Sequence, residues 1–339
     1  MVRLALLAAL LALSPTQSAP LVDAGYQEAV FSVSSLPAYS TFFRDVAGWE
    51  QLAAGPVPRQ QLDAWRLAKD VSARFTVFGN RGTNRGFVRL IEFTNVAQKQ
   101  IRSNAQSWDT GGWFDVNTRV ANMSAKFAEL QADGWQATSD PVQFRFGPFV
   151  VIEWLARGPD GIVLAMIERV QPPLEGYPEL RELSRLFNAT QVVTDLDDAQ
   201  RFYIDTLGFK TYLEHRGASP EEGPNVLGIP HNLADDIERD VVIVHPHGIN
   251  EGSVELLAFD GLTGADFAAN AAPPNLGILM LRFPASDIEV LHARLVEHRV
   301  EVVYPPTDID LEPYGDVRML GIRGPGGAWL EFYETRATR

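Results

Sequence analysis

The sequence contains no cysteine. This absence excludes disulfide bonds, thiolate nucleophiles and metal sites with cysteine ligands. Basic residues are also few, because 29 Lys and Arg stand against 43 Asp and Glu, which gives a net charge of −14. An acidic chain without a basic patch repels a phosphate backbone, so we expect no nucleic-acid partner. Any catalysis must therefore use histidine, carboxylates, hydroxyl groups or a bound cofactor, and the sequence names no cofactor.

Long apolar runs are also missing from the sequence, apart from ten residues near the start, Leu4 to Leu13. This run follows Arg3 and precedes small residues that end at Pro20, a pattern typical of a signal peptide. Ten apolar residues span only about half of a bilayer core, so a permanent anchor is disfavoured. We predict a signal peptide at 1–19, a periplasmic or secreted protein, and no membrane association after cleavage.

No nucleotide-binding glycine loop, zinc-protease motif or serine-hydrolase elbow occurs in the sequence. Internal repeats are present instead. Residues 28–50 align with 188–210 at an offset of 160, and 86–93 align with 252–259 at an offset of 166. The sequence is therefore two copies of one unit, separated by the proline-rich stretch at 171–178.

Each copy divides again into two similar parts. An alternating strand pattern, an amphipathic helix and short strands ending in a hairpin begin near residues 28, 114, 188 and 277. We therefore predict an α+β protein with four βαβββ modules, at about 26–96, 112–170, 184–260 and 275–335. The predicted organisation is one domain at 20–170, a linker at 171–183 and a second domain at 184–339.

The paired modules, the strand-to-helix run at 192–209 and the hairpins at 159–165 and 325–331 resemble the vicinal oxygen chelate superfamily. That superfamily includes glyoxalase I, extradiol dioxygenases and bleomycin-resistance proteins. The resemblance implies two half-barrel domains, each with a cup between two modules. It also implies that divalent-metal ligands come from the first and last strand of each module.

Carried over by alignment, the metal positions do not hold a complete ligand set. In the first half they are Glu28, Arg89, Asp115 and Ala165, and in the second half Asn188, Glu255, Met280 and Glu331. A guanidinium group cannot ligate a metal, so Glu28, Arg89 and Asp115 are expected to form an ion-pair cluster, and no metal is expected in the first half. Glu255 and Glu331 remain candidate metal ligands and catalytic residues in the second half, where a divalent ion is possible.

Further residues of the second half are candidate ligand contacts. His245 and His247 lie on a hairpin that leads to Glu255, where either could act as a general base or replacement ligand; exposed loop positions are the alternative. Tyr314 occupies a position where the superfamily often has an aromatic residue facing the ligand. Arg282 could pair with Glu255 or Glu331, or bind a substrate carboxylate.

Two functions remain open from the sequence. The first is an exported protein that binds a small organic molecule in one cup, with degenerate metal sites. The second is a divalent-metal-dependent lyase or isomerase, or an extradiol-type dioxygenase, with Glu255 and Glu331 around the metal. A purely structural role is a third possibility, since duplicated domains often retain one degenerate copy.

Overall fold

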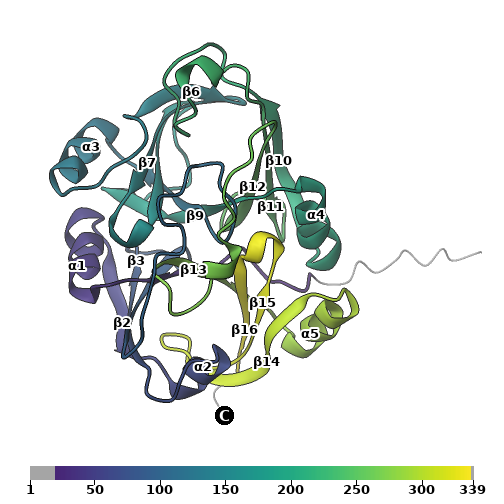
Figure 1. The fold of residues 1–339 in the computed structure, drawn as a ribbon. Helices are drawn as coiled ribbons and strands as arrows, with labels where there is room; N and C mark the ends of the chain where they lie inside the picture. Colours follow the sequence, from purple (N-terminus) through teal and green to yellow (C-terminus); the bar gives the residue numbers. More distant parts are fainter. Residues whose placement is uncertain (1–19, 337–339) are drawn as a thin grey trace, which may run out of the picture.

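The computed structural model of the protein describes residues 20–336, so the predicted signal peptide at 1–19 lies outside the described residues. Its strands form two sheets of eight strands each (Figure 1). One sheet contains β1 (Glu28–Ser32), β2 (Glu50–Pro56), β3 (Ser72–Gly79), β4 (Phe87–Thr94), β13 (Gly277–Pro284), β14 (Glu301–Asp310), β15 (Asp316–Arg323) and β16 (Trp329–Thr335). The other contains β5 (Asp115–Val120), β6 (Val142–Phe146), β7 (Phe149–Arg157), β8 (Val163–Gln171), β9 (Leu183–Val192), β10 (Lys210–Gly217), β11 (Arg239–His245) and β12 (Ser253–Phe259).

One helix follows the first strand of each module: α1 (Leu36–Thr41), α3 (Met123–Ala132), α4 (Leu196–Gln200) and α5 (Ile288–Glu297). The residue before each helix accepts a hydrogen bond from a backbone N–H of the first turn; these caps are Ser35, Asn122, Asp195 and Asp287. In the first and third modules the helix continues as a π-helical stretch, η1 (Phe42–Val46) and η3 (Arg201–Thr206). The predicted α+β fold of four βαβββ modules is confirmed.

The remaining helical elements are short. They are α2 (Arg59–Ala64), which lies between β2 and β3, and the 3-10 turns η2 (Pro159–Gly161), η4 (His231–Leu233), η5 (Ala268–Asn270) and η6 (Pro325–Gly327). Among residues 20–336, no helix has the length and apolarity needed to cross a membrane.

The modules pair differently from the prediction that 20–170 and 184–339 each form a separate cup. β1 pairs antiparallel with β13, which joins the first module to the fourth, and β5 pairs antiparallel with β9, which joins the second to the third. We call the curved sheet of modules 1 and 4 cup A, and that of modules 2 and 3 cup B. In Figure 1, cup B forms the upper part of the molecule and cup A the lower part.

The physical reason is that the first strand of each module has a free edge that any other first strand can complete. The repeat pattern defines the modules but does not say which edges meet. Because β8 and β9 both belong to cup B, the predicted linker at 171–183 connects two strands of one sheet. It does not separate two domains.

One apolar core joins the two sheets. The largest cluster of buried apolar side chains includes residues of all four module helices, such as Tyr39, Leu130, Ala199 and Leu291. Phe42 of module 1 also stacks on Trp135 of module 2, with ring centres 4.7 Å apart. The two cups therefore share this core. The side chains on the concave face of each cup form separate clusters.

Candidate ligand-binding site

The concave face of cup A carries a closed network of four charged side chains. Glu28 on β1 pairs with Arg89 on β4 at 2.7 Å and with Arg282 on β13 at 2.6 Å. Arg282 also pairs with Glu331 on β16 at 2.6 Å. All four side chains are buried, and their charges cancel, as buried charges in proteins generally do. Burial alone would raise the pKa of Glu28, but the two guanidinium groups outweigh burial and hold that pKa below its ordinary value.

Aromatic side chains occupy the rest of cup A. The indole nitrogen of Trp65, which follows α2, donates a hydrogen bond to Glu331 at 2.7 Å. The Tyr304 hydroxyl donates to the same carboxylate oxygen at 2.7 Å. On the other side of the network, the Tyr314 hydroxyl donates to Glu28 at 3.1 Å. Cup A is therefore filled by the chain's own side chains.

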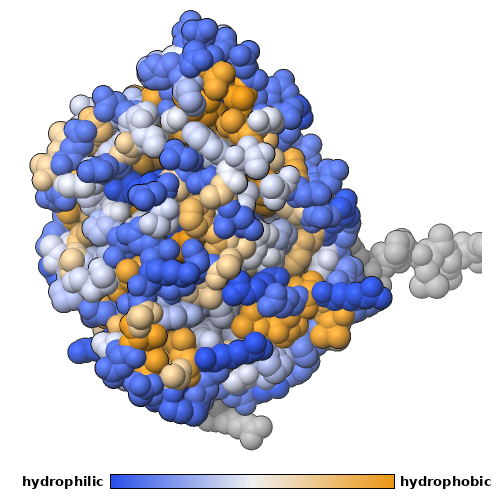
Figure 2. Space-filling model, in the orientation of Figure 1, coloured by the Kyte–Doolittle hydropathy of each residue, from blue (hydrophilic) through white to orange (hydrophobic). Residues whose placement is uncertain are grey.

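Cup B instead encloses a cavity of about 1060 Å³. Its apolar walls include the aromatic rings of Phe114, Phe144, Phe146, Phe149, Tyr177, Phe187 and Tyr212. Two connections complete the wall, 172–175 after β8 and 217–227 after β10. Figure 2 shows apolar residues framed by hydrophilic ones at the top of the molecule, in the region of β6. Cavities of this kind accept small organic molecules.

Three carboxyl groups lie on the polar part of the cavity wall: Asp115 on β5, Glu153 on β7 and Glu255 on β12. Burial raises the pKa of Asp115 to about 7. Burial and the neighbouring acidic groups raise the pKa of Glu153 and of Glu255 to about 8. At neutral pH the two glutamates are therefore largely protonated, and they can donate as well as accept hydrogen bonds.

Two arginines line the same cavity without an ion-pair partner among residues 20–336. Arg119 on β5 is 6% exposed, its Nε has no hydrogen-bond partner, and its guanidinium carbon lies 4.0 Å from the centre of the Phe187 ring. Arg169 on β8 stacks in the same way on Phe149 at 3.9 Å, and its buried Nε also lacks a partner. Burial and the nearby charge of Arg119 lower the pKa of Arg169.

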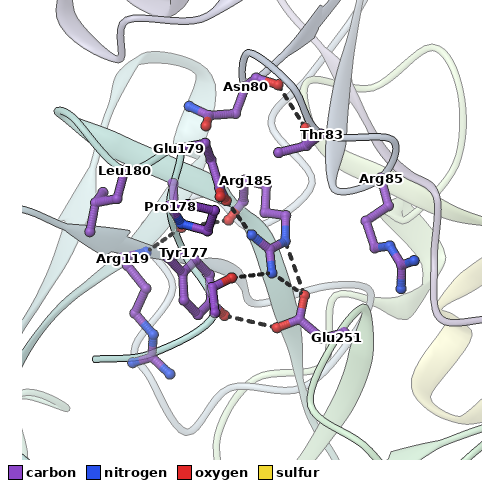
Figure 3. Close-up of polar contacts among 12 residues, drawn as sticks. Asn80, Thr83, Arg85, Arg119, Tyr177, Pro178, Glu179, Leu180, Arg185 and Glu251 are labelled. Carbon is purple, nitrogen blue, oxygen red and sulfur yellow. Dashed lines mark hydrogen bonds and ion pairs between the residues drawn. The ribbon is translucent and has the colours of Figure 1, made fainter. Parts of the chain in front are cut away.

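A polar cluster fixes the connection between β8 and β9 at the rim of cup B (Figure 3). Arg185 on β9 forms ion pairs with Glu179 and, at 2.7 Å, with Glu251. The Tyr177 hydroxyl donates a hydrogen bond to Glu251 at 3.2 Å. Figure 3 shows Arg119 beside Tyr177, with its guanidinium group pointing away from this cluster. The cluster thus neutralises Arg185 but not Arg119.

The structure separates the two carboxylates that the sequence assigned to one metal site. Glu331 on β16 lies in cup A, whereas Glu255 on β12 lies in cup B. The expectation that they converge is wrong, because the third and fourth modules belong to different sheets. Shared catalysis or shared metal binding by Glu255 and Glu331 is therefore excluded by this arrangement.

The other predicted residues also divide between the cups. Glu28, Arg89, Arg282 and Tyr314 belong to the filled cup A, whereas Asn188 and Asp115 line the cavity of cup B. The predicted ion pair of Glu28 with Arg89 is present, and Arg282 pairs with Glu331, one of its two predicted partners. The inclusion of Asp115 in the same ion-pair cluster is wrong, because its module pairs with module 3.

His245 and His247 do not line the cavity. His245 is 1% exposed, and its Nδ1 accepts a hydrogen bond from the backbone N–H of His247 at 2.9 Å. The His247 Nε2 lies 2.7 Å from the backbone oxygen of Asp23, in the segment before β1. Burial lowers the pKa of His245 to about 4. The predicted role of these histidines in the cup is therefore wrong, because their hairpin faces the N-terminal segment.

The donor set of neither cup fits a divalent metal ion of the superfamily type. In cup A the aligned positions hold Glu28, Arg89, Met280 and Glu331, and both carboxylates already bind guanidinium groups, which offer no lone pair. In cup B they hold Asp115, Ala165, Asn188 and Glu255. Ala165 has no donor, and the amide oxygen of Asn188 accepts a hydrogen bond from Asn117 at 2.8 Å. Within residues 20–336, no three acidic or histidine side chains converge as a metal site requires.

Sequence reasoning missed Arg119, Arg169 and Glu153. A signal for two of them was present. Strand alternation at 115–120 places Asp115, Asn117 and Arg119 on one face, and such a polar face predicts the wall of a polar cavity. Glu153 is the one charged residue in the run 149–156, which is also unusual for a buried strand.

Comparison with known proteins supports the fold. Residues 185–332 match the model of the Glyoxalase/Bleomycin resistance protein/Dioxygenase superfamily. Glyoxalase I from Zea mays is similar in structure, with a TM-score of 0.59 and 16% identity over 92% of each chain. A putative dioxygenase from Bacillus subtilis subsp. subtilis str. 168 has a TM-score of 0.56 and 14% identity, over 92% of this chain and 86% of that chain.

Sequence identities this low show a shared fold and not a shared activity. A comparison with curated proteins gives no significant match. The family match, the two structural relatives and the four repeated modules agree with one another. Residues 185–332 match the superfamily model, and residues 20–336 as a whole have the fold of the two structural relatives, in a form with four modules and two cups.

Proposed function

We propose that the protein binds a small organic molecule in the cavity of cup B. The contrast between the cups is the observation that carries this proposal. Both are built from the same repeated strands, but cup A is filled by its own side chains and cup B encloses about 1060 Å³. A cavity with apolar walls and a few polar groups is the usual form of a small-molecule site.

The difference between the cups has a local origin. In module 1, the connection between β2 and β3 at 57–71 forms α2 and inserts Trp65 into cup A. In module 3, the corresponding connection at 218–238 is six residues longer. Its first part borders the cavity of cup B. This insertion favours a retained binding cavity in cup B and a purely structural role for the interior of cup A.

The binding groups are those of the chain itself, because the donor sets do not fit a divalent ion. The carboxyl groups of Asp115, Glu153 and Glu255, together with Asn188, supply hydrogen bonds. The aromatic walls supply apolar contact area. The protein is thus proposed as a binding member of its superfamily.

A fluorescent apolar probe, N-phenyl-1-naphthylamine, tests the proposal. We expect saturable binding that Ile167→Trp abolishes, because Ile167 lines the cavity and the larger ring would fill it. Val290→Trp on α5, where Val290 is 50% exposed, is the matched control and should bind like the unaltered protein. Absence of saturable binding, or equal binding by the Ile167→Trp variant with its thermal unfolding unchanged, would refute the proposal.

We also propose that the protein acts in the periplasm or outside the cell. The support is the sequence of residues 1–19, with Arg3, the Leu4 to Leu13 run and small residues before Pro20. Mass spectrometry of the protein from its native host should find a new N-terminus near Ala19 or Pro20. Recovery of the complete chain from the cytoplasm would contradict export.

A further inference from the structure

Arg119 differs from the arginines buried in cup A. Arg89 and Arg282 each pair with at least one buried carboxylate. Arg119 is 6% exposed and lines the cavity of cup B, yet it has no ion-pair partner within residues 20–336, and its Nε makes no hydrogen bond. A buried cation without a partner is unfavourable and therefore rare in proteins. The missing partner of Arg119 is not explained by a shortage of carboxylates, because the chain has a net charge of −14.

A second unpaired arginine lies close to Arg119. Arg119 on β5 pairs with Ile167 on the adjacent strand β8, and Arg169 lies two residues further along β8, so both arginines project from the same face of neighbouring strands. After burial, the charge of Arg119 contributes to the lowered pKa of Arg169, so the two guanidinium groups repel each other. Each stacks on an aromatic ring, Phe187 for Arg119 and Phe149 for Arg169. Stacking of this kind contributes about 0.5–2 kcal/mol and orients the guanidinium plane. It does not remove the repulsion, which an anion between the two groups would do.

The acidic groups of the cavity do not prevent an anion from binding. Burial keeps Glu153 and Glu255 largely protonated at neutral pH, so they carry little negative charge there. Asp115, whose pKa burial raises to about 7, is only about half ionised at that pH. The cavity therefore combines the two unpaired arginines with aromatic walls and with carboxyl groups that are largely or partly protonated. This combination suits a molecule with an apolar body and one negatively charged end.

We propose that the ligand of cup B is an organic anion, a carboxylate or sulfonate with an apolar body, whose charged group lies between Arg119 and Arg169. This inference rests on the proposed function, because it names the class of molecule for the same cavity. It adds Arg119 and Arg169 as the residues that select for charge.

A matched pair of probes tests the inference. 8-Anilinonaphthalene-1-sulfonate and N-phenyl-1-naphthylamine share one aromatic skeleton, and only the first carries a negative group. We expect Arg119→Gln and Arg169→Gln each to weaken binding of the sulfonate about tenfold, since charge-assisted hydrogen bonds are lost. Binding of the uncharged probe should change less than about twofold. Arg74→Gln, at an exposed position on β3 in the other sheet, controls for the change in net charge.

The outcomes separate this inference from the proposed function. If neither probe binds the unaltered protein in the cavity, the proposed function itself fails. If both probes bind and neither arginine substitution changes the ratio of their affinities, the cavity stands and the selection for an anion is wrong. Equal weakening of both probes would also overturn it, because the arginines would then act only through the shape of the cavity. Arg169 is only partly buried, so its variant keeps the test valid if Arg119→Gln does not fold.

Discussion

A glutamate on the last strand of a module has opposite energetic consequences in the two cups. Glu331 is fully buried and forms an ion pair with Arg282. Glu255 faces the cavity beside Asp115 and Glu153, and burial and these neighbours disfavour its ionised form. Replacing each by glutamine removes an ionisable carboxyl group from the same kind of strand. The two substitutions should therefore change stability in opposite directions.

Glu255→Gln should stabilise the protein at alkaline pH. The unfolded chain releases the Glu255 proton near pH 4.5, whereas the folded chain retains it until about pH 8. The folded state binds more protons between these values, so this group lowers stability as the pH rises from about 4.5 to 8. A rise of this pKa from 4.5 to about 8 corresponds to roughly 4–5 kcal/mol, so we expect the free energy of unfolding to increase by up to that amount near pH 9 and to be unchanged near pH 4. Urea denaturation at both pH values measures this change in the free energy of unfolding. A variant that is less stable than the unaltered protein at pH 9 would contradict the prediction.

Glu331→Gln should destabilise the protein. Arg282 would still pair with Glu28, which also pairs with Arg89. It would lose its buried ion pair with the Glu331 carboxylate. Breaking a buried ion pair by removing one partner costs about 3–5 kcal/mol. Urea denaturation at pH 7 should show a loss of about 3 kcal/mol. If this variant is as stable as the unaltered protein, the four-charge network does not hold cup A together.

The sequence predicted some of these residue roles and not others, for an identifiable reason. An arginine inside the apolar strand around Arg282 requires a carboxylate, and from the sequence this could be Glu255, Glu331 or the carboxylate of a substrate. Choosing between them requires knowing which modules share a sheet. For the same reason Asp115 was grouped with Glu28 and Arg89, although its own module faces cup B.

At the scale of elements, one connection determines whether a cup is filled or open. The connection at 57–71 is short and contains α2, and the indole of Trp65, the residue after α2, reaches Glu331 in cup A. The longer connection at 218–238 has only the 3-10 turn η4, and part of it borders the cavity of cup B. The change of repeat offset from 160 to 166 located this insertion in the sequence. The offset did not show that the inserted residues border a cavity, because an alignment gives the length of a connection and not the path that it follows in the fold.

At the scale of the molecule, the repeats and their boundaries were predictable, but the partner of each module was not. Strand periodicity identified the four modules because each has its own alternating strands and capped helix. Pairing depends on contacts between distant segments, such as Glu28 with Arg282 and Phe42 with Trp135. Modules adjacent in the chain therefore lie in different sheets, and the shared core crosses the middle of the sequence.

This interleaved arrangement determines how the protein should behave when divided at Gly176, an exposed glycine between β8 and β9. Each half contains one module of each cup, so alone it would leave the free edges of β1 and β5, or of β9 and β13, without their partners. The first half would also bury Arg89 with Glu28 but lack Arg282. We expect neither half to show a cooperative thermal transition as a monomer. Both halves, expressed together, should copurify in equal amounts and unfold as one unit. If each half alone forms a stable monomer, the two first strands within a half can pair with each other. The modules would then fold without the observed pairing of cups A and B.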